Sequence, residues 1–147
     1  TMSAQEDVLG DLAHVAQDGI AFYESARSKV TEPEIREVFS RMVEAKKALL
    51  ADLAEPLAQS GKAIPKLTTV SGAIRELYVD IRALLASNNE TVYVAQLEKV
   101  EDRLLSDVRG ALRETVDPVV RARLQVSLPR MRACHDEMRS LKQRLGA

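Results

Sequence analysis

The sequence predicts an all-α protein built around four long helices, and three observations support this prediction. Helix-favouring residues dominate the 147 positions, whereas glycine and proline number only 6 and 5, a composition unlike that of a sandwich or barrel. Apolar residues recur at alternating spacings of three and four along four segments, which is the period of one helix face. Two short breaks and one long connection join these segments. The predicted helices cover about residues 4–29, 32–60, 90–115 and 118–145, with a shorter helix at about 71–86.

The first two helices are predicted to form an antiparallel hairpin. Ser3 and Glu6 have the spacing of a capping box, and so do Thr31 and Glu34, with a proline in the first turn between them. The break between the two helices is too short for any other arrangement. Gly19 lies on the apolar seam of the first helix and lowers its helix propensity, which indicates close approach of a neighbouring helix.

The third and fourth helices are predicted to form a second hairpin. The connection before them is about 29 residues long, and its extended and helical parts can travel the length of the bundle. The third helix therefore starts at the same end as the second and runs parallel to it. The run Ser87-Asn88-Asn89 is predicted to cap the third helix, and Asp117 followed by Pro118 begins the fourth. Pro129 is predicted to kink the fourth helix.

These elements together give one domain over residues 1–147, with two antiparallel hairpins joined by a long crossover that contains the short helix. This is the topology of ferritin-like bundles. Three residues offer extra apolar surface: Leu105, Leu112 and Val119. Together with the crossover helix, they either cover the bundle or form the face of a homodimer.

The overall charge excludes several classes of partner. Basic and acidic residues number 21 and 22 and are interleaved along the helices, so no large field attracts nucleic acid or an anionic membrane. No apolar run approaches the roughly 20 residues that span a bilayer, and the first residues lack the features of an export signal. The lone Cys134 rules out an internal disulfide and suits a reducing cytoplasm. We therefore expect a cytoplasmic protein.

The candidate site is centred on Glu101 in the third long helix. The residues on this seam recur at spacings of three and four, and they are Val94, Leu97, Glu101, Leu104, Val108 and Ala111. A carboxylate on an otherwise apolar seam either has a buried partner or marks a functional site.

A standard di-iron centre is not expected in this bundle. Such a centre needs a Glu-x-x-His pair from each of two helices, and the chain has only 2 histidines. His14 is expected on the outer side of the first helix, and so is Asp18; a cation, Arg132, stands three residues before His135. The second helix has no histidine and directs Lys46 inward.

Two alternatives remain for Glu101. In the first, Glu101 belongs to a buried polar cluster with Lys46, His135 or Arg132. In the second, Glu98, Glu101 and His135 hold iron, manganese or zinc in a degenerate site. We favour the first alternative because cations beside the acids repel a metal ion.

Several of these residues also carry a resemblance to a known family. They comprise Leu9-x-x-Leu12, Asp18-Gly19, the stretch from Phe39 through Lys46 to Leu53, Glu98-x-x-Glu101-Asp102, and His135 with Leu141. Over about residues 8–145 the chain resembles the bacterial ferritin-like four-helix family that is known only as a domain of unknown function. It departs from that family in having Val100 where glycine is expected, and in Pro129. The resemblance implies a ferritin-like fold and almost no function, because members of the family are largely uncharacterised.

The expected function is therefore that of a non-enzymatic helical-bundle protein, a stress-associated or protein-interaction module with a polar cluster around Glu101 in its core. The alternative is a ferritin-like metal-binding protein.

Overall fold

The computed structural model describes residues 2–59, 69–87 and 89–146, with side chains described for 8–54, 72–87 and 89–146. Within these residues the chain forms helices and no strands, so the all-α prediction is confirmed. The helices are α1 (Met2–Arg27), α2 (Pro33–Gln59), α3 (Thr69–Leu85), α4 (Glu90–Glu114) and α5 (Pro118–Arg144). Because α1 begins at Met2, Ser3 lies inside the helix rather than at its N-cap; the side chains of Ser3 and Glu6 lie outside the described part.

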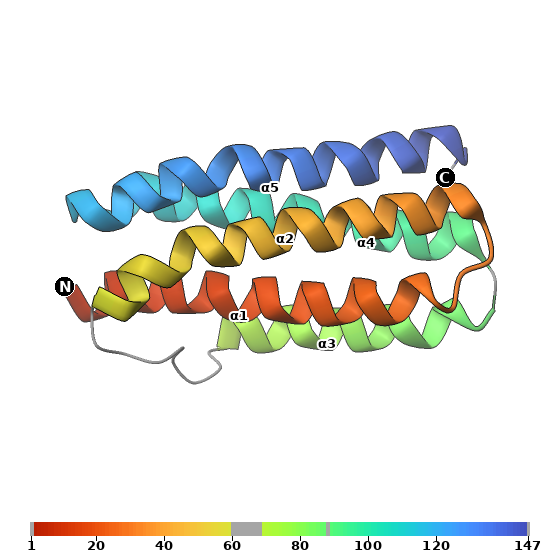
Figure 1. The fold of residues 1–147 in the computed structure, drawn as a ribbon, viewed down its shortest axis with the longest axis horizontal. Helices are drawn as coiled ribbons and strands as arrows, with labels where there is room; N and C mark the ends of the chain where they lie inside the picture. Colours follow the sequence, from red (N-terminus) through yellow and green to blue (C-terminus); the bar gives the residue numbers. More distant parts are fainter. Residues whose placement is uncertain (1, 60–68, 88, 147) are drawn as a thin grey trace.

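The helices lie side by side as long rods (Figure 1). α1 and α2 form one antiparallel hairpin, α4 and α5 form the other, and α2 packs against α5. α3 returns along the bundle, so that α4 starts at the same end as α2 and runs in the same direction (Figure 1).

α3 is part of the wall of the core, because it packs against both α1 and α4. Its buried residues are Ile74, Tyr78, Ile81 and Leu85. The position of α3 corrects one expectation from the sequence, in which Asp18 lay on the outer side of the first helix. The Asp18 side chain is only 15% exposed, and its Oδ1 lies 2.9 Å from Arg75 Nη2 of α3. Asp18 faces α3 because that helix covers this side of α1.

The structure shows how the predicted N-terminal caps of α5 and α4 are formed. Asp117 caps α5 as predicted, because its Oδ1 accepts hydrogen bonds from the backbone N–H groups of Val119 and Val120 at 2.9 and 3.1 Å. Asn89 occupies the N-cap position of α4, but its side chain makes no capping hydrogen bond. Its Oδ1 instead accepts a hydrogen bond from Thr91 Oγ1 at 3.0 Å, and its backbone carbonyl accepts hydrogen bonds from the N–H groups of Val92 and Tyr93.

Pro129 lies inside α5, which continues through it as one helix from Pro118 to Arg144. Pro129 and Gln125 are both exposed. Pro129 has no N–H group, so the backbone carbonyl of Gln125 lacks its usual partner within the helix.

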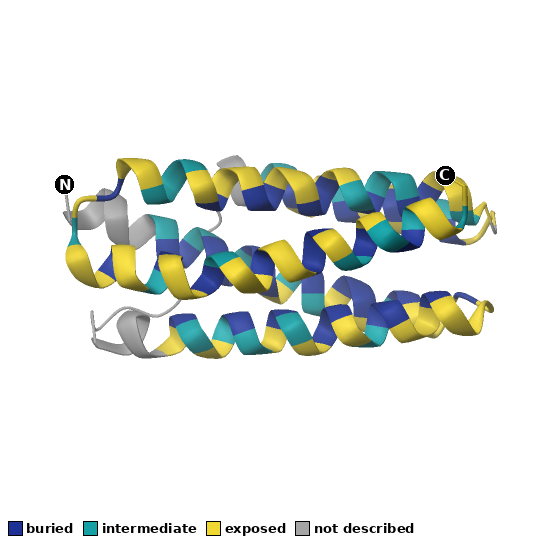
Figure 2. Cartoon of the chain, turned by 90° about the horizontal axis from the view of Figure 1, so that it is seen from above, coloured by how far each residue is buried: buried dark blue, intermediate teal, exposed yellow. Residues whose placement is uncertain are grey.

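All five helices contribute to the core. Buried residues recur along the inner side of each helix and exposed residues along the outer side (Figure 2). Leu105 is buried and Leu112 is partly buried against the core, so these two residues cover the bundle. Val119, by contrast, is 56% exposed. Within the described residues, no helix combines the length and hydrophobicity needed to cross a membrane.

Candidate functional site

An ion pair lies in the middle of the bundle between α2 and α4. Lys46 Nζ lies 3.0 Å from Glu101 Oε1 and donates a hydrogen bond to Oε2 at 3.1 Å. The two side chains are 1% and 0% exposed. From α1, Tyr23 Oη donates a hydrogen bond to Glu101 Oε1 at 3.0 Å. Both oxygens of the buried carboxylate therefore accept hydrogen bonds, as a charge in a low-dielectric core requires.

Helical spacing brings these side chains together. Lys46 lies four residues after Met42 and three before Leu49, both of which are buried, so its side chain points inward from α2. Glu101 lies at the corresponding position in α4, between Leu97 and Leu104. Each charged residue thus replaces one apolar residue of its seam.

Gly19 makes room for the lysine side chain. A Cβ atom placed on Gly19 would lie 2.5 Å from Cδ and 2.9 Å from Cε of Lys46, and 3.1 Å from Tyr78 Oη. The close approach expected at this glycine is therefore that of two side chains, Lys46 of α2 and Tyr78 of α3.

Aromatic rings surround the ion pair. The chain has 3 tyrosines, 2 phenylalanines and no tryptophan, and four of these five rings form one cluster: Phe22, Tyr23, Phe39 and Tyr78. Phe22 stacks on Tyr78 with 5.0 Å between ring centroids. Lys46 Nζ lies 5.9 Å from the centroid of the Tyr23 ring, within the range of a cation–π interaction. The cluster excludes water and strengthens the electrostatic attraction inside it.

The groups around Glu101 hold their protons at neutral pH. Burial is the largest single influence and lowers the pKa of Lys46, but the charge of Glu101, the neighbouring Tyr78 and Cys134, and the hydrogen bond to Glu101 together raise that pKa above its ordinary value. Burial, and then Glu101, raise the pKa of Tyr23 well above its ordinary value. Burial also raises the pKa of the Cys134 thiol to about 11, so this cysteine is a poor nucleophile. Lys46 therefore remains positively charged in the core at neutral pH.

A second cluster lies nearer the surface between α4 and α5. His135 Nε2 lies 3.5 Å from Glu98 Oε1 and 3.4 Å from Asp102 Oδ1, and His135 Nδ1 lies 3.1 Å from Asp136 Oδ1. Lys142 Nζ lies 3.8 Å from Glu98 Oε2. The structure therefore brings Glu98 and His135 together.

Glu101 is not part of this second cluster, since its carboxylate contacts Lys46 and Tyr23. Arg132 is exposed on α5. Among the described residues, no group of three or more His, Cys, Asp or Glu side chains has a geometry that could hold a metal ion.

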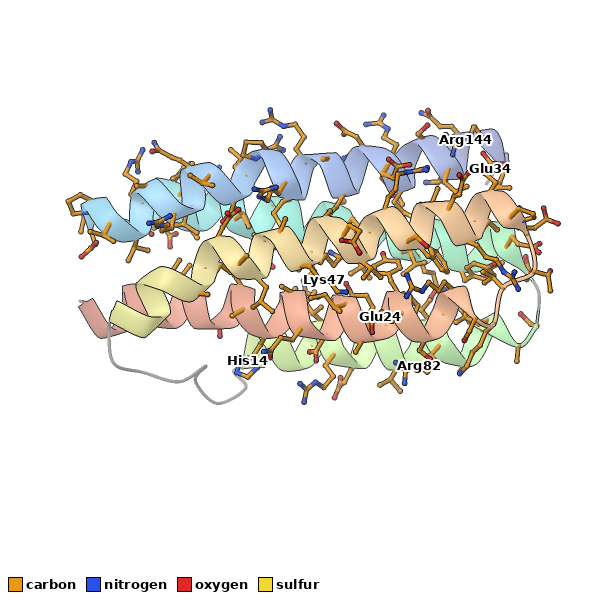
Figure 3. The ribbon with its side chains drawn as sticks, in the orientation of Figure 1. His14, Glu24, Glu34, Lys47, Arg82 and Arg144 are labelled. Atoms are coloured by element: carbon orange, nitrogen blue, oxygen red, sulfur yellow. The ribbon has the colours of Figure 1, made fainter. Side chains whose placement is uncertain are left out.

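Most other charged side chains lie on the outside of the bundle (Figure 3). Glu24 Oε1 and Lys47 Nζ lie 3.5 Å apart across α1 and α2, and Arg144 pairs with Glu34 where α5 meets α2. These exposed pairs contribute little to stability. They differ from Lys46 and Glu101 in being open to water.

Sequence reasoning missed the roles of two tyrosines. Tyr23 lies on the apolar seam of the first helix. A polar hydroxyl on that seam, like the carboxylate of Glu101, indicates a buried hydrogen-bond partner. Tyr78 lies on the buried side of α3, and its hydroxyl has no hydrogen-bond partner among the described residues.

Tyr23→Phe is expected to lower the free energy of unfolding by about 1.5–3 kcal/mol, because it removes a buried hydrogen bond to a charged group. Tyr78→Phe is the matched control and should not lower the free energy of unfolding, since the buried hydroxyl that it removes makes no hydrogen bond. Urea denaturation followed by circular dichroism measures both. Equal losses in the two variants would contradict the assigned role of Tyr23.

Comparison with known proteins adds a family. The family model described as Domain of unknown function (DUF2383) matches residues 4–114, a span that runs from α1 to the end of α4. No curated protein and no solved structure matches the chain.

Proposed function

We propose a function for this chain, which belongs to the family described as Domain of unknown function (DUF2383). It is a non-enzymatic, ferritin-like protein-interaction module that works without a bound metal. One observation carries this proposal: Lys46 Nζ lies 3.0 Å from Glu101 Oε1, with both side chains at most 1% exposed. A cation of the protein itself balances the carboxylate in the middle of the bundle.

The path of the chain supports the ferritin-like part of the proposal. The hairpins α1–α2 and α4–α5 are joined by a connection that makes α2 and α4 parallel (Figure 1), as in ferritin-like bundles. The position of α3 is the departure from a four-helix arrangement, because α3 packs between α1 and α4.

The charge on Lys46 supports the metal-free part. In di-iron bundles, inward carboxylates are neutralised by metal ions. Here Glu101 accepts hydrogen bonds from Lys46 and Tyr23 at both oxygens. A metal ion would have to displace a buried ammonium group whose pKa is raised by the same carboxylate.

Elemental analysis of protein purified without a chelator tests this proposal. Iron, manganese and zinc are each expected far below one ion per chain, because Lys46 repels a cation from Glu101. Stoichiometric metal that disappears in Glu101→Ala would overturn the proposal. Lys46→Met is a useful second sample, since it removes the positive charge and leaves the carboxylate in place.

The second candidate function is metal binding at a degenerate site. Of the three ligands expected for it, Glu98, Glu101 and His135, the structure brings Glu98 and His135 together. The distance of 3.5 Å between His135 Nε2 and Glu98 Oε1 favours it. The same elemental analysis distinguishes metal bound at the surface cluster around His135 from metal bound in the core at Glu101. Metal that is lost in His135→Ala and retained in Glu101→Ala would lie at the surface cluster, whereas the reverse pattern would place it in the core.

A further inference from the structure

α5 carries a second apolar seam, which faces solvent. Its inward seam includes Val120, Leu124, Met131 and Met138, all of which are buried. On the opposite side, apolar residues again alternate by three and four, and every one of them is exposed: Val119, Ala122, Val126, Pro129 and Ala133. We call these five residues the outer seam.

Part of the exposed apolar surface of the described chain lies on the outer seam. The large hydrophobic residues that are exposed are Val79, Val92, Val116, Val119 and Val126. Two of these five, Val119 and Val126, belong to the outer seam and are exposed by 56 and 46%. Val116, which precedes α5, is exposed by 81%. A shallow hollow lies on the same face, lined by Pro118, Val119, Ala122, Arg123 and Val126. A seam with heptad spacing and a hollow along it fits the apolar face of another helix.

Positive charge borders the outer seam on both sides. From Pro118 to Arg132, α5 contains four arginines and no acidic residue. Helical geometry puts Arg123 and Arg130 along one edge of the seam and Arg132 along the other, at the positions that select partners in coiled coils. Arg130 forms an ion pair with Asp52 of α2, whereas Arg132 is exposed.

The arginines beside the outer seam distinguish between two possible binding partners, a second copy of this chain and a different protein. A second copy of α5 would bring arginine against arginine, which disfavours pairing of the seam with itself. We propose that the outer seam binds an amphipathic helix of a partner protein, one whose apolar stripe is bordered by Glu or Asp. This inference rests on the proposed interaction role and names the surface and the chemistry of the partner.

Two synthetic peptides of about three heptads each test the proposal. Both carry the same Leu and Ala stripe; one has Glu at every flanking position and the other has Lys. Fluorescence anisotropy titration should show at least about tenfold tighter binding of the Glu peptide, which is the combined effect of several surface ion pairs. Added salt should reduce the difference, because it screens exposed charges.

Surface variants locate the binding face. Val126→Gln should weaken binding of the Glu peptide by about fivefold or more through lost apolar contact. Arg132→Glu should weaken the Glu peptide and strengthen the Lys peptide. Val79→Gln and Arg82→Glu on α3 are matched controls at exposed positions, and they should bind both peptides like the unchanged chain.

The proposal is overturned if the Glu peptide does not bind at about 1 mM, if both peptides bind equally, or if Val126→Gln and Arg132→Glu bind as the unchanged chain does. It is also overturned if sedimentation shows a dimer that Val126→Gln dissociates, since the occupant would then be a second copy. Metal content is measured separately. Stoichiometric metal at Glu101 together with selective peptide binding would overturn the metal-free part of the proposed function and leave this inference standing.

Discussion

Lys46→Met is expected to lower the free energy of unfolding by roughly 3–5 kcal/mol, because it leaves the carboxylate of Glu101 buried without its counter-ion. Glu101 is 0% exposed, so water cannot replace the lost ammonium group. The remaining donor, Tyr23 Oη, contacts only Oε1. Urea denaturation at neutral pH, followed by circular dichroism, measures the loss.

Two comparisons make this result specific to the pair. Lys47→Met removes the neighbouring lysine, whose side chain is 52% exposed, and should cost less than about 1 kcal/mol. The double variant Lys46→Met with Glu101→Leu should be much milder than either single change, because apolar groups of similar volume often replace a buried ion pair with little loss. Additive losses in the double variant would rule out direct coupling between Lys46 and Glu101.

The apolar periodicity and the connection lengths predicted most of the fold. Three-and-four spacing identified the inward sides of the long helices, and Asp117 with Pro118 marked the start of α5. The lateral position of α3 could not be predicted in the same way. Its stripe of Ile74, Tyr78, Ile81 and Leu85 predicts one buried side, but which helices it touches depends on how far apart α1 and α4 lie.

The sequence predicts which residues of the candidate site point inward, but it does not predict which of them contact one another. The pattern places Gly19, Lys46 and Glu101 on the inward sides of three different helices. Periodicity within one helix does not give the register between helices, so it left Lys46, His135 and Arg132 as alternative partners of Glu101. The register found in the structure sets Lys46 against Glu101 and leaves His135 with Glu98 and Asp102.

Gly19→Ala is expected to lower the free energy of unfolding by about 1–3 kcal/mol, although alanine is the better helix former by about 1 kcal/mol. The new Cβ would lie 2.5 Å from Lys46 Cδ, closer than two carbon atoms can approach. Lys46 cannot move aside cheaply, because its Nζ is held at 3.0 Å from Glu101 Oε1 in the core. Thermal and urea denaturation measure the change.

Gly110→Ala on α4 is the matched control. A Cβ on Gly110 would meet only Arg113 Nη2 at 3.8 Å, an ordinary contact with the end of a flexible side chain. This substitution should therefore stabilise the protein by up to about 1 kcal/mol through helix propensity and reduced freedom of the unfolded chain. If Gly19→Ala stabilised the protein to the same extent, Gly19 would not be needed to admit the lysine side chain.

The background of Lys46→Met with Glu101→Leu tests the cause of the loss at Gly19. Methionine at position 46 is flexible and no longer held by a carboxylate, so it can turn away from a Cβ on residue 19. The destabilisation by Gly19→Ala should therefore fall by at least about half in this background, a coupling between neighbours that a double-mutant cycle detects. An unchanged loss would mean that the backbone of α1, rather than the ion pair, requires glycine at this position.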